Sequence, residues 1–141
     1  MKKKLTVFLT TMMLCICAVC SASDGTDLDT EEKYVNLFFA GKDYPKVAAF
    51  MDPQLAKNVT EEQYKALFER LNRDLGKLAS KKLRVCQVFD DGQILHYAAA
   101  FEKAKDMRIV MGFKKEGNKI TLMDFRVVDP NAKAPETPAK K

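Results

Sequence analysis

The sequence holds few of the residues that usually carry catalysis or bind metal. Its 141 residues include one histidine, His96, and three of the four cysteines lie within the first 20 positions. One histidine without a cysteine cluster argues against a structural zinc site. A glycine-rich phosphate loop and a nucleophile elbow are also missing from the sequence. These absences leave no signature of an enzyme, and we expect no metal and no cofactor.

The first 23 residues have the three regions of a secretory signal peptide. Residues 1–4 are rich in lysine, residues 5–20 are uncharged, and residues 21–23 are small. The apolar run is shorter than the roughly 20 residues of a membrane-spanning helix, so we expect export to the periplasm or beyond without a permanent membrane span. A lipid-anchored Cys20 is the alternative, although the residue before it does not fit the pattern of lipidated cysteines. Cleavage leaves Cys86, and a cysteine in a strand is usually a small buried residue.

The net charge of +5 comes from the two ends of the chain. Three lysines leave with the predicted signal peptide, and residues 131–141 carry three lysines and one glutamate. Residues 24–130, the predicted single domain, are close to neutral, which argues against nucleic acid as a partner. Residues 131–141 contain two prolines and no large apolar side chain, so we expect a disordered tail.

The first half of the domain has the pattern of helices. The first helix is predicted to begin at Asp29, where Asp29 and Glu32 have the spacing of a capping box. Gly41 is a natural end for this helix. Asp43 is predicted to cap a second helix, and Asp52 begins one more short helical turn.

The longest helix has the clearest local signals. Thr60 and Gln63 have capping-box spacing, and apolar residues recur at helical intervals from Tyr64 onward. Gly76 is the predicted C-terminal stop. The charged residues on the rest of its surface indicate a solvated face with a few ion pairs, and we assign that face no function.

Residues 83–128 contain four apolar segments separated by three short polar turns. The turns lie at residues 91–92, 103–106 and 115–118. Segments rich in branched and aromatic residues between such turns predict an antiparallel four-stranded meander. The predicted fold class is therefore α+β, with N-terminal helices packed on one face of a four-stranded antiparallel sheet.

A two-residue turn at Asp91 and Gly92 sets a register that gives the sheet two unequal faces. The face predicted to lie under the helices is rich in methionine and phenylalanine and carries Cys86, Val88, Leu95, Tyr97, Phe101, Met107, Ile109, Met111, Phe113, Met123, Phe125 and Val127. The opposite face carries Leu83, Val85, Gln87, Phe89, Ile94, His96, Ala98, Ala100, Arg108, Val110, Leu122, Asp124, Arg126 and Val128. A bulge near residues 120–123 would change these assignments.

Several segments resemble an uncharacterised family of small secreted bacterial domains. They are residues 41–47 (GKDYPKV), 50–55 (FMDPQL), 60–64 (TEEQY) and the pair at 75–76. The resemblance covers about residues 29–128. That family resembles the nuclear transport factor two-like cone fold, and its members are often found ahead of an alpha/beta hydrolase domain. The resemblance implies a curved, cone-like sheet with a pocket between sheet and helices, and it transfers no catalytic residue.

Two groups of side chains are candidates for a functional site. An adaptable apolar pocket where the helices meet the sheet would be lined by Tyr34, Tyr64, Tyr97, Met107, Met111, Met123 and Phe125. The competing interpretation is that these residues fill the core. A polar group on the second sheet face consists of His96, Arg108 and Asp124, with Arg108 opposite Asp124 in the predicted register.

The favoured interpretation is a non-enzymatic binding module for a small apolar ligand or a protein partner. One alternative is a cone-fold enzyme in which His96 near a carboxylate acts as a general base. The simpler interpretation of Arg108 and Asp124 is that they form a cross-strand ion pair. The other alternative is a homodimer formed through the second sheet face.

Overall fold

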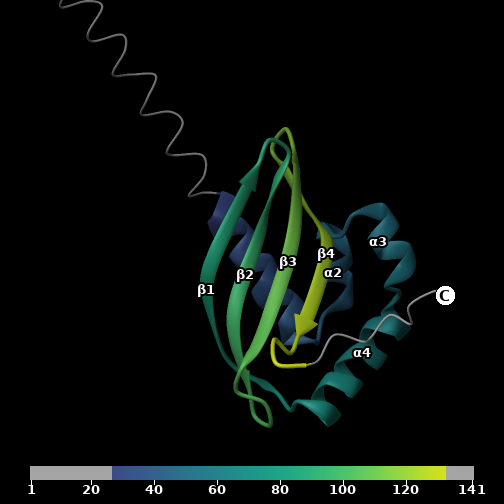
Figure 1. The fold of residues 1–141 in the computed structure, drawn as a ribbon. Coiled ribbons are helices and arrows are strands. Elements are labelled where there is room, and N and C mark those ends of the chain that lie inside the picture. The colour runs from purple at the N-terminus through teal and green to yellow at the C-terminus, as the bar shows by residue number, and fades with distance from the viewer. Residues whose placement is uncertain (1–26, 133–141) are drawn as a thin grey trace, which may run out of the picture.

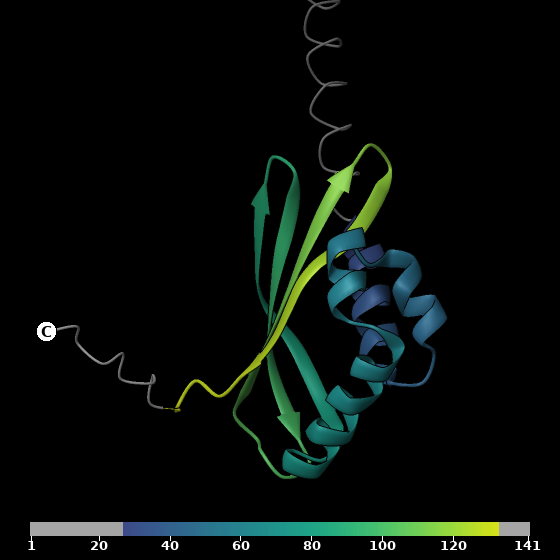
Figure 2. The same ribbon diagram turned by 90° about the vertical axis from the view of Figure 1, so that its right-hand side faces the viewer.

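The computed structural model describes residues 27–132. The predicted signal peptide, residues 1–23, and all but two residues of the predicted tail lie outside this range. A first helix, whose described residues are 27–40, is followed by α2 (Tyr44–Phe50), α3 (Pro53–Asn58), α4 (Glu61–Asp74), β1 (Leu78–Phe89), β2 (Gly92–Phe101), β3 (Met107–Glu116) and β4 (Lys119–Val128). The strands form one antiparallel sheet in the order β1-β2-β3-β4, and the described helices lie on one face of it (Figure 1, Figure 2). The predicted α+β class is confirmed.

Three helices begin at the predicted caps. The carboxylates of Asp43 and Asp52 accept hydrogen bonds from first-turn amides of α2 and α3, respectively. Thr60 and Gln63 form the full capping box of α4, in which the Thr60 amide donates to Gln63 Oε1 at 3.1 Å. Gly76 follows the end of α4 with a φ of 78°, the left-handed conformation that favours glycine. Local sequence therefore decides where these helices begin and where the longest one ends.

The first helix reaches further toward the N-terminus than its pattern predicts. Residues 27 and 28 are already helical, so Asp29 lies inside the helix and the predicted capping box with Glu32 is wrong. Leu28 packs against the core, and this burial favours a helix that continues past the aspartate. The helix ends before Gly41, as predicted.

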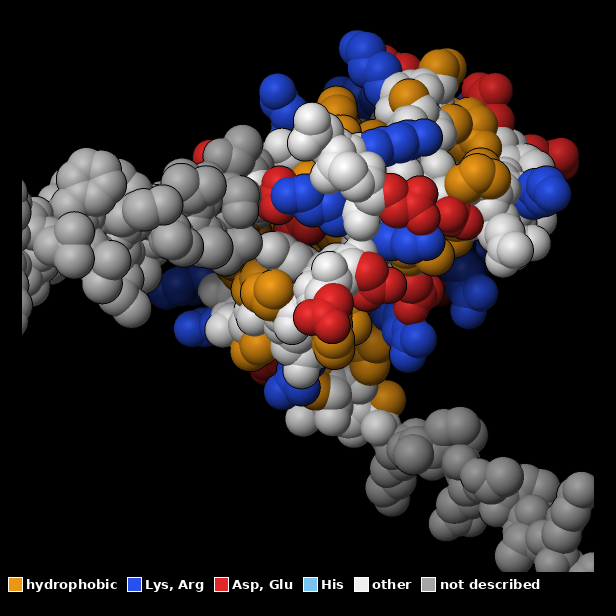
Figure 3. Space-filling view, turned by 90° about the horizontal axis from the view of Figure 1, so that it is seen from above, with side chains coloured by type: hydrophobic (Ala, Val, Ile, Leu, Met, Phe, Trp, Pro, Cys, Tyr) orange, Lys and Arg blue, Asp and Glu red, His pale blue; other side chains and the backbone are white. Residues whose placement is uncertain are grey.

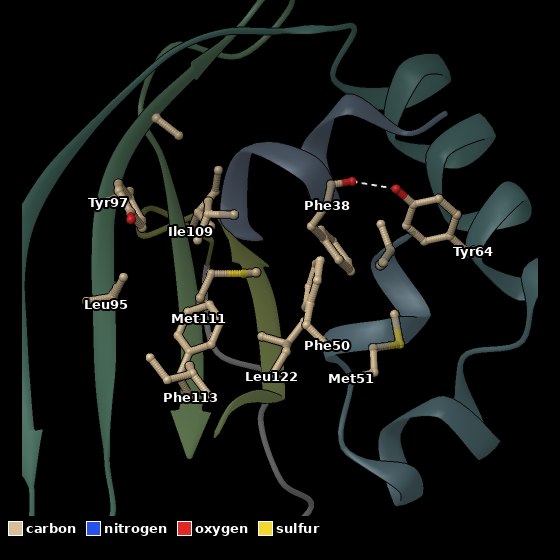
Figure 4. Packing of buried hydrophobic residues seen from close by; sticks show 14 of the residues in the cluster. Phe38, Phe50, Met51, Tyr64, Leu95, Tyr97, Ile109, Met111, Phe113 and Leu122 are labelled. Carbon is tan, nitrogen blue, oxygen red and sulfur yellow. Dashed lines mark hydrogen bonds between the residues drawn. The ribbon is translucent and has the colours of Figure 1, made fainter. Parts of the chain in front are cut away.

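The space between sheet and helices is filled by a core rich in aromatic rings (Figure 4). Phe38 is fully buried, and its ring centroid lies 5.6 Å from that of Tyr64 and 4.6 Å from that of Phe125. The Tyr64 hydroxyl donates to the Phe38 carbonyl at 2.6 Å and so ties α4 to the first helix. The residues predicted for the covered face that are buried or half-buried in this core are Leu95, Tyr97, Phe101, Met107, Ile109, Met111, Phe113, Phe125 and Val127.

The first hairpin has a different register from the predicted one. Its turn lies at Asp90 and Asp91, and Phe89 pairs with Gly92. The strands are therefore shifted by two residues relative to the prediction. Because side chains alternate with a period of two, this shift leaves each residue near the turn on its predicted face.

Two further predictions for β1 are wrong. Cys86 and Val88 are exposed, because the tip of the β1–β2 hairpin extends beyond the helices (Figure 2). Leu83 is half-buried against the core, because a bulge between Leu83 and Val85 moves it to the covered face. The second half of β1 therefore has side chains exposed on both of its faces.

A bulge in β4 exchanges the faces of two neighbouring residues. Gly112 pairs with Asp124, whereas Phe113 pairs with Leu122, so Met123 is the extra residue. Leu122 is fully buried, and Met123 is 41% exposed on the side away from the helices. Both assignments are the reverse of the predicted ones, and the bulge lies where the pattern of β4 was irregular.

Candidate functional site

The sheet face away from the helices is the uncovered face. Its side chains form four rows that run across the strands. The rows are Lys82-Ala98-Arg108-Val128, Val85-His96-Val110-Arg126, Gln87-Ile94-Gly112-Asp124 and Phe89-Gly92-Lys114-Thr121. Successive rows are two residues apart, which is about 7 Å. Apolar and polar side chains therefore alternate within a small area.

A first hollow of about 490 Å³ lies over the second, third and fourth rows. Gly112 is in the middle of the third row, so no side chain fills the space above β3 at this point. Apolar side chains surround that gap, among them Phe89, Ile94, Val110 and Met123. Phe89 is 53% exposed and Met123 is 41% exposed, so the apolar lining is open to solvent.

The polar side chains of the first hollow form two separate pairs. His96 Nε2 lies 3.1 Å from Gln87 Oε1, and Arg126 Nε donates to Asp124 Oδ2 at 3.0 Å. His96 lies on β2 and Asp124 on β4, two strand spacings apart and in successive rows, so their backbones are about 12 Å apart. The two residues line the same hollow but do not form the hydrogen-bonded pair of a general base.

The predicted pairing of Arg108 with Asp124 is wrong. Arg108 lies opposite Val128, because the β3–β4 turn contains only residues 117–118 and one extra residue follows in β4. The carboxylate of Asp124 instead pairs with Arg126 on its own strand. Arg108 lies on a different part of the uncovered face.

A second hollow of about 370 Å³ lies beside the first on the uncovered face. Arg84 and Arg108 line it together with the small side chain of Ala98. Gln87 and His96 line both hollows, so the two hollows are adjacent on the uncovered face, with the His96–Gln87 pair at their shared border.

Charges of both signs surround the first hollow. The ammonium of Lys114 pairs with Glu116 at 2.6 Å, and Arg126 pairs with Asp124. Seen from the end at which the β1–β2 and β3–β4 turns lie, acidic and basic side chains are interspersed with hydrophobic ones (Figure 3). The cations next to the first hollow are therefore largely neutralised by their neighbours.

The seven predicted pocket residues lie in three environments. Tyr64, Tyr97, Met107 and Met111 are buried in the core, Tyr34 and Phe125 are half-buried against it, and Met123 lies on the uncovered face. Tyr64, Tyr97 and Met111 are seen among the packed side chains in Figure 4. Of the seven, Met123 lines the first hollow and Tyr97 lines the second.

A buried carboxyl group that sequence reasoning missed lies between the first helix and the sheet. Glu31 is 2% exposed, and its Oε2 atom has no hydrogen-bond partner within residues 27–132. Burial and then the charge of Asp27 raise the pKa of Glu31 to about 7, while Lys115 opposes this rise. Glu31 lies four residues before Val35 on the buried stripe of the helix, so a signal for its position was present in the sequence.

Comparisons of the chain with protein families, with curated proteins and with solved structures give no match. Within residues 27–132, no helix is both long and apolar enough to cross a membrane. In the same range, no group of three or more histidine, cysteine, aspartate or glutamate side chains is arranged to hold a metal ion. The function is therefore inferred from the geometry of the uncovered face.

Proposed function

We propose that this chain is a non-enzymatic binding module whose uncovered face holds a small apolar ligand. The observation that supports the proposal is the first hollow, with Gly112 beneath it and exposed Phe89 and Met123 around it. Its volume of about 490 Å³ falls within the range of small-molecule sites. Exposed apolar side chains grouped around a hollow are a feature of binding surfaces. The site lies on the opposite side of the sheet from the pocket that the sequence predicts.

The two polar pairs at the hollow provide orientation for a ligand that is otherwise held by apolar contact. His96 with Gln87 and Asp124 with Arg126 offer hydrogen-bond donors and acceptors on both sides of Gly112. A few polar groups in a mostly apolar lining are typical of sites that bind one ligand in one orientation. The separation of His96 from Asp124 disfavours the general-base enzyme, because a base needs its partners within hydrogen-bond distance.

The proposal places the protein outside the cytoplasm, in the periplasm or secreted. This part rests on the signal-peptide pattern of residues 1–23, which precede the described residues. The binding proposal does not depend on it, because every residue of the first hollow lies between Gln87 and Arg126.

Replacing Gly112 with valine is expected to weaken binding of the neutral apolar dye N-phenyl-1-naphthylamine by about tenfold or more, which is about 1.4 kcal/mol. A Cβ atom at Gly112 would come no closer than 3.8 Å to any neighbour, so the strand accepts a side chain without strain. The added isopropyl group occupies the space that the ligand needs. Dye fluorescence titrated with wild-type and variant protein measures the effect.

Ser80→Val is the matched control for this experiment. Ser80 is an exposed residue of β1 that pairs with Ala100, away from the residues of the first hollow. The control adds the same apolar group to a strand and is expected to leave dye affinity unchanged. Equal affinity of wild type and Gly112→Val, with both proteins folded, would contradict the proposal.

A second candidate function is association of two copies through the uncovered face. It is favoured by exposed apolar side chains at its edges, since Val85 is 48% and Val128 is 42% exposed. For such a dimer, Val110→Glu is expected to convert a dimer into a monomer in size-exclusion chromatography with light scattering. Lys105→Glu, in the loop after β2, is the control. A monomeric wild-type protein would exclude this candidate and leave ligand binding in place.

A further inference from the structure

The second hollow is distinguished by arginines that lack a counter-charge among the described residues. Residues 27–132 contain five arginines, and three of them, Arg70, Arg73 and Arg126, each pair with an aspartate. The other two, Arg84 and Arg108, make no ion pair within the described residues, and both line this hollow. On the uncovered face, the arginine charge that has no neighbouring carboxylate is therefore concentrated at the second hollow.

The sequence around these arginines leaves room for a group between them. The side chain next to Arg108 on β2 is Ala98, and Lys82 lies on the other side of Ala98 on β1. A methyl group between long cationic side chains leaves space above the sheet where a larger residue would fill it. Arg84 comes from the bulge of β1 and reaches the same hollow. Guanidinium groups bind carboxylate and phosphate oxygens through paired N–H donors.

The second hollow adjoins the more apolar first hollow. His96 and Gln87 line both, and Ala98 and Ile94 are four residues apart on β2, about 13 Å. An anionic group between the arginines would therefore have an apolar surface within reach on one side. Inorganic phosphate or another small anion would occupy the second hollow alone and leave the first hollow empty.

We infer that the ligand of the uncovered face is an anionic amphiphile with a single apolar chain. Its carboxylate or phosphate group lies between Arg84 and Arg108, and its apolar part lies over Gly112 between Phe89 and Met123. This inference rests on the proposed function and names the chemical class of its ligand. Charge complementarity with the two arginines selects an anion over a cation or a neutral molecule of the same length.

The test compares amphiphiles that differ only in the headgroup. Displacement of N-phenyl-1-naphthylamine from the purified chain is measured with dodecanoate and dodecylamine below their micelle concentrations, with dodecanol below its solubility limit, and with sodium phosphate alone. Dodecanoate is expected to bind at least about tenfold more tightly than dodecanol. Arg108→Gln is expected to remove this difference by lowering the affinity for dodecanoate. Arg70→Gln, on α4, is the matched control and is expected to keep the preference.

The outcomes separate this inference from the proposed function. Equal affinity for dodecanoate and dodecanol overturns the inference and leaves the proposed function intact, whereas binding of neither amphiphile nor the dye overturns both. Phosphate that binds as tightly as dodecanoate overturns the inference in favour of a small-anion site. Binding to anionic phospholipid vesicles without binding to dodecanoate overturns it in favour of a membrane surface. A persisting preference in the Arg84→Gln, Arg108→Gln double variant overturns the assignment of the headgroup to these arginines.

Discussion

Replacing Phe38 with alanine is expected to lower the free energy of unfolding by about 3–5 kcal/mol. The side chain is fully buried where the first helix, α4 and β4 meet, with its ring centroid 5.6 Å from that of Tyr64 and 4.6 Å from that of Phe125. Truncation removes the apolar contact and leaves a cavity that three separate elements line. Because helices and sheet cannot all shift toward one point, the cavity closes only in part, and the cost lies in the upper range for core substitutions.

Equilibrium unfolding in urea, followed by far-ultraviolet circular dichroism, measures this loss. The control is Asn36→Ala, two residues away on the exposed side of the same helix, which is expected to change stability by no more than about 0.5 kcal/mol. The Tyr64 hydroxyl bonds to the backbone carbonyl of Phe38, so that hydrogen bond remains available in the variant. A loss below about 1 kcal/mol for Phe38→Ala would show that the ring is not central to the core.

The starts of α2, α3 and α4 were predictable because their signals are local. Asp43, Asp52 and Thr60 each bond to an amide two or three residues further along the chain, so the residue types at that spacing are sufficient evidence. The two-residue alternation of the strands is local as well. The faces predicted from this alternation hold near the first turn although the hairpin is shifted, because a shift by an even number of residues keeps every side chain on its face.

The bulge in β4 depends on contacts that a sequence pattern does not contain. The Leu122 carbonyl accepts a hydrogen bond from the Asp52 amide at 2.9 Å, and Met51 forms a parallel bridge with Leu122. These residues are about 70 positions apart in the sequence, so the alternation of β4 indicates a bulge near residues 120–123 but does not identify Met123 as the extra residue. The bulge turns Met123 outward and Leu122 inward, and it thereby changes the lining of the first hollow.

The residues of the candidate site were therefore easier to predict than its shape. Alternation placed Phe89, Ile94, His96 and Val110 on one face of the sheet, where the structure has them. The hollow itself arises where Gly112 lies beside these residues, and that requires the true register of three strands. The pairing of strands is set by packing over the whole domain, because the turns alone allow several registers.

Glu31 is the one residue of the buried helix stripe whose charge should make folding depend on pH. Its pKa is raised from 4.5 to about 7 in the folded state, first by burial and then by Asp27. The charged and titratable groups that face it are Asp27 on its own helix, Lys115 on β3 and Tyr97 on β2. Below pH 4.5 the carboxyl group is protonated in both the folded and the unfolded chain, so it has no effect. As pH rises, the unfolded chain releases this proton first, and the folded state loses stability until the pH passes about 7.

The Glu31→Gln variant is expected to remove this loss. Its free energy of unfolding relative to wild type should become about 3 kcal/mol more favourable between pH 4 and pH 8, at about 1.4 kcal/mol for each pKa unit. Subtracting the wild-type curve cancels the exposed carboxylates, such as Asp43 and Asp74, that titrate in both proteins. Asn36→Ala, which changes no titrating group, should give a difference that does not vary with pH. A Glu31→Gln difference that is equally flat would mean that the Glu31 carboxyl group is hydrated in the folded protein, because water at Oε2 removes the burial cost that raises its pKa.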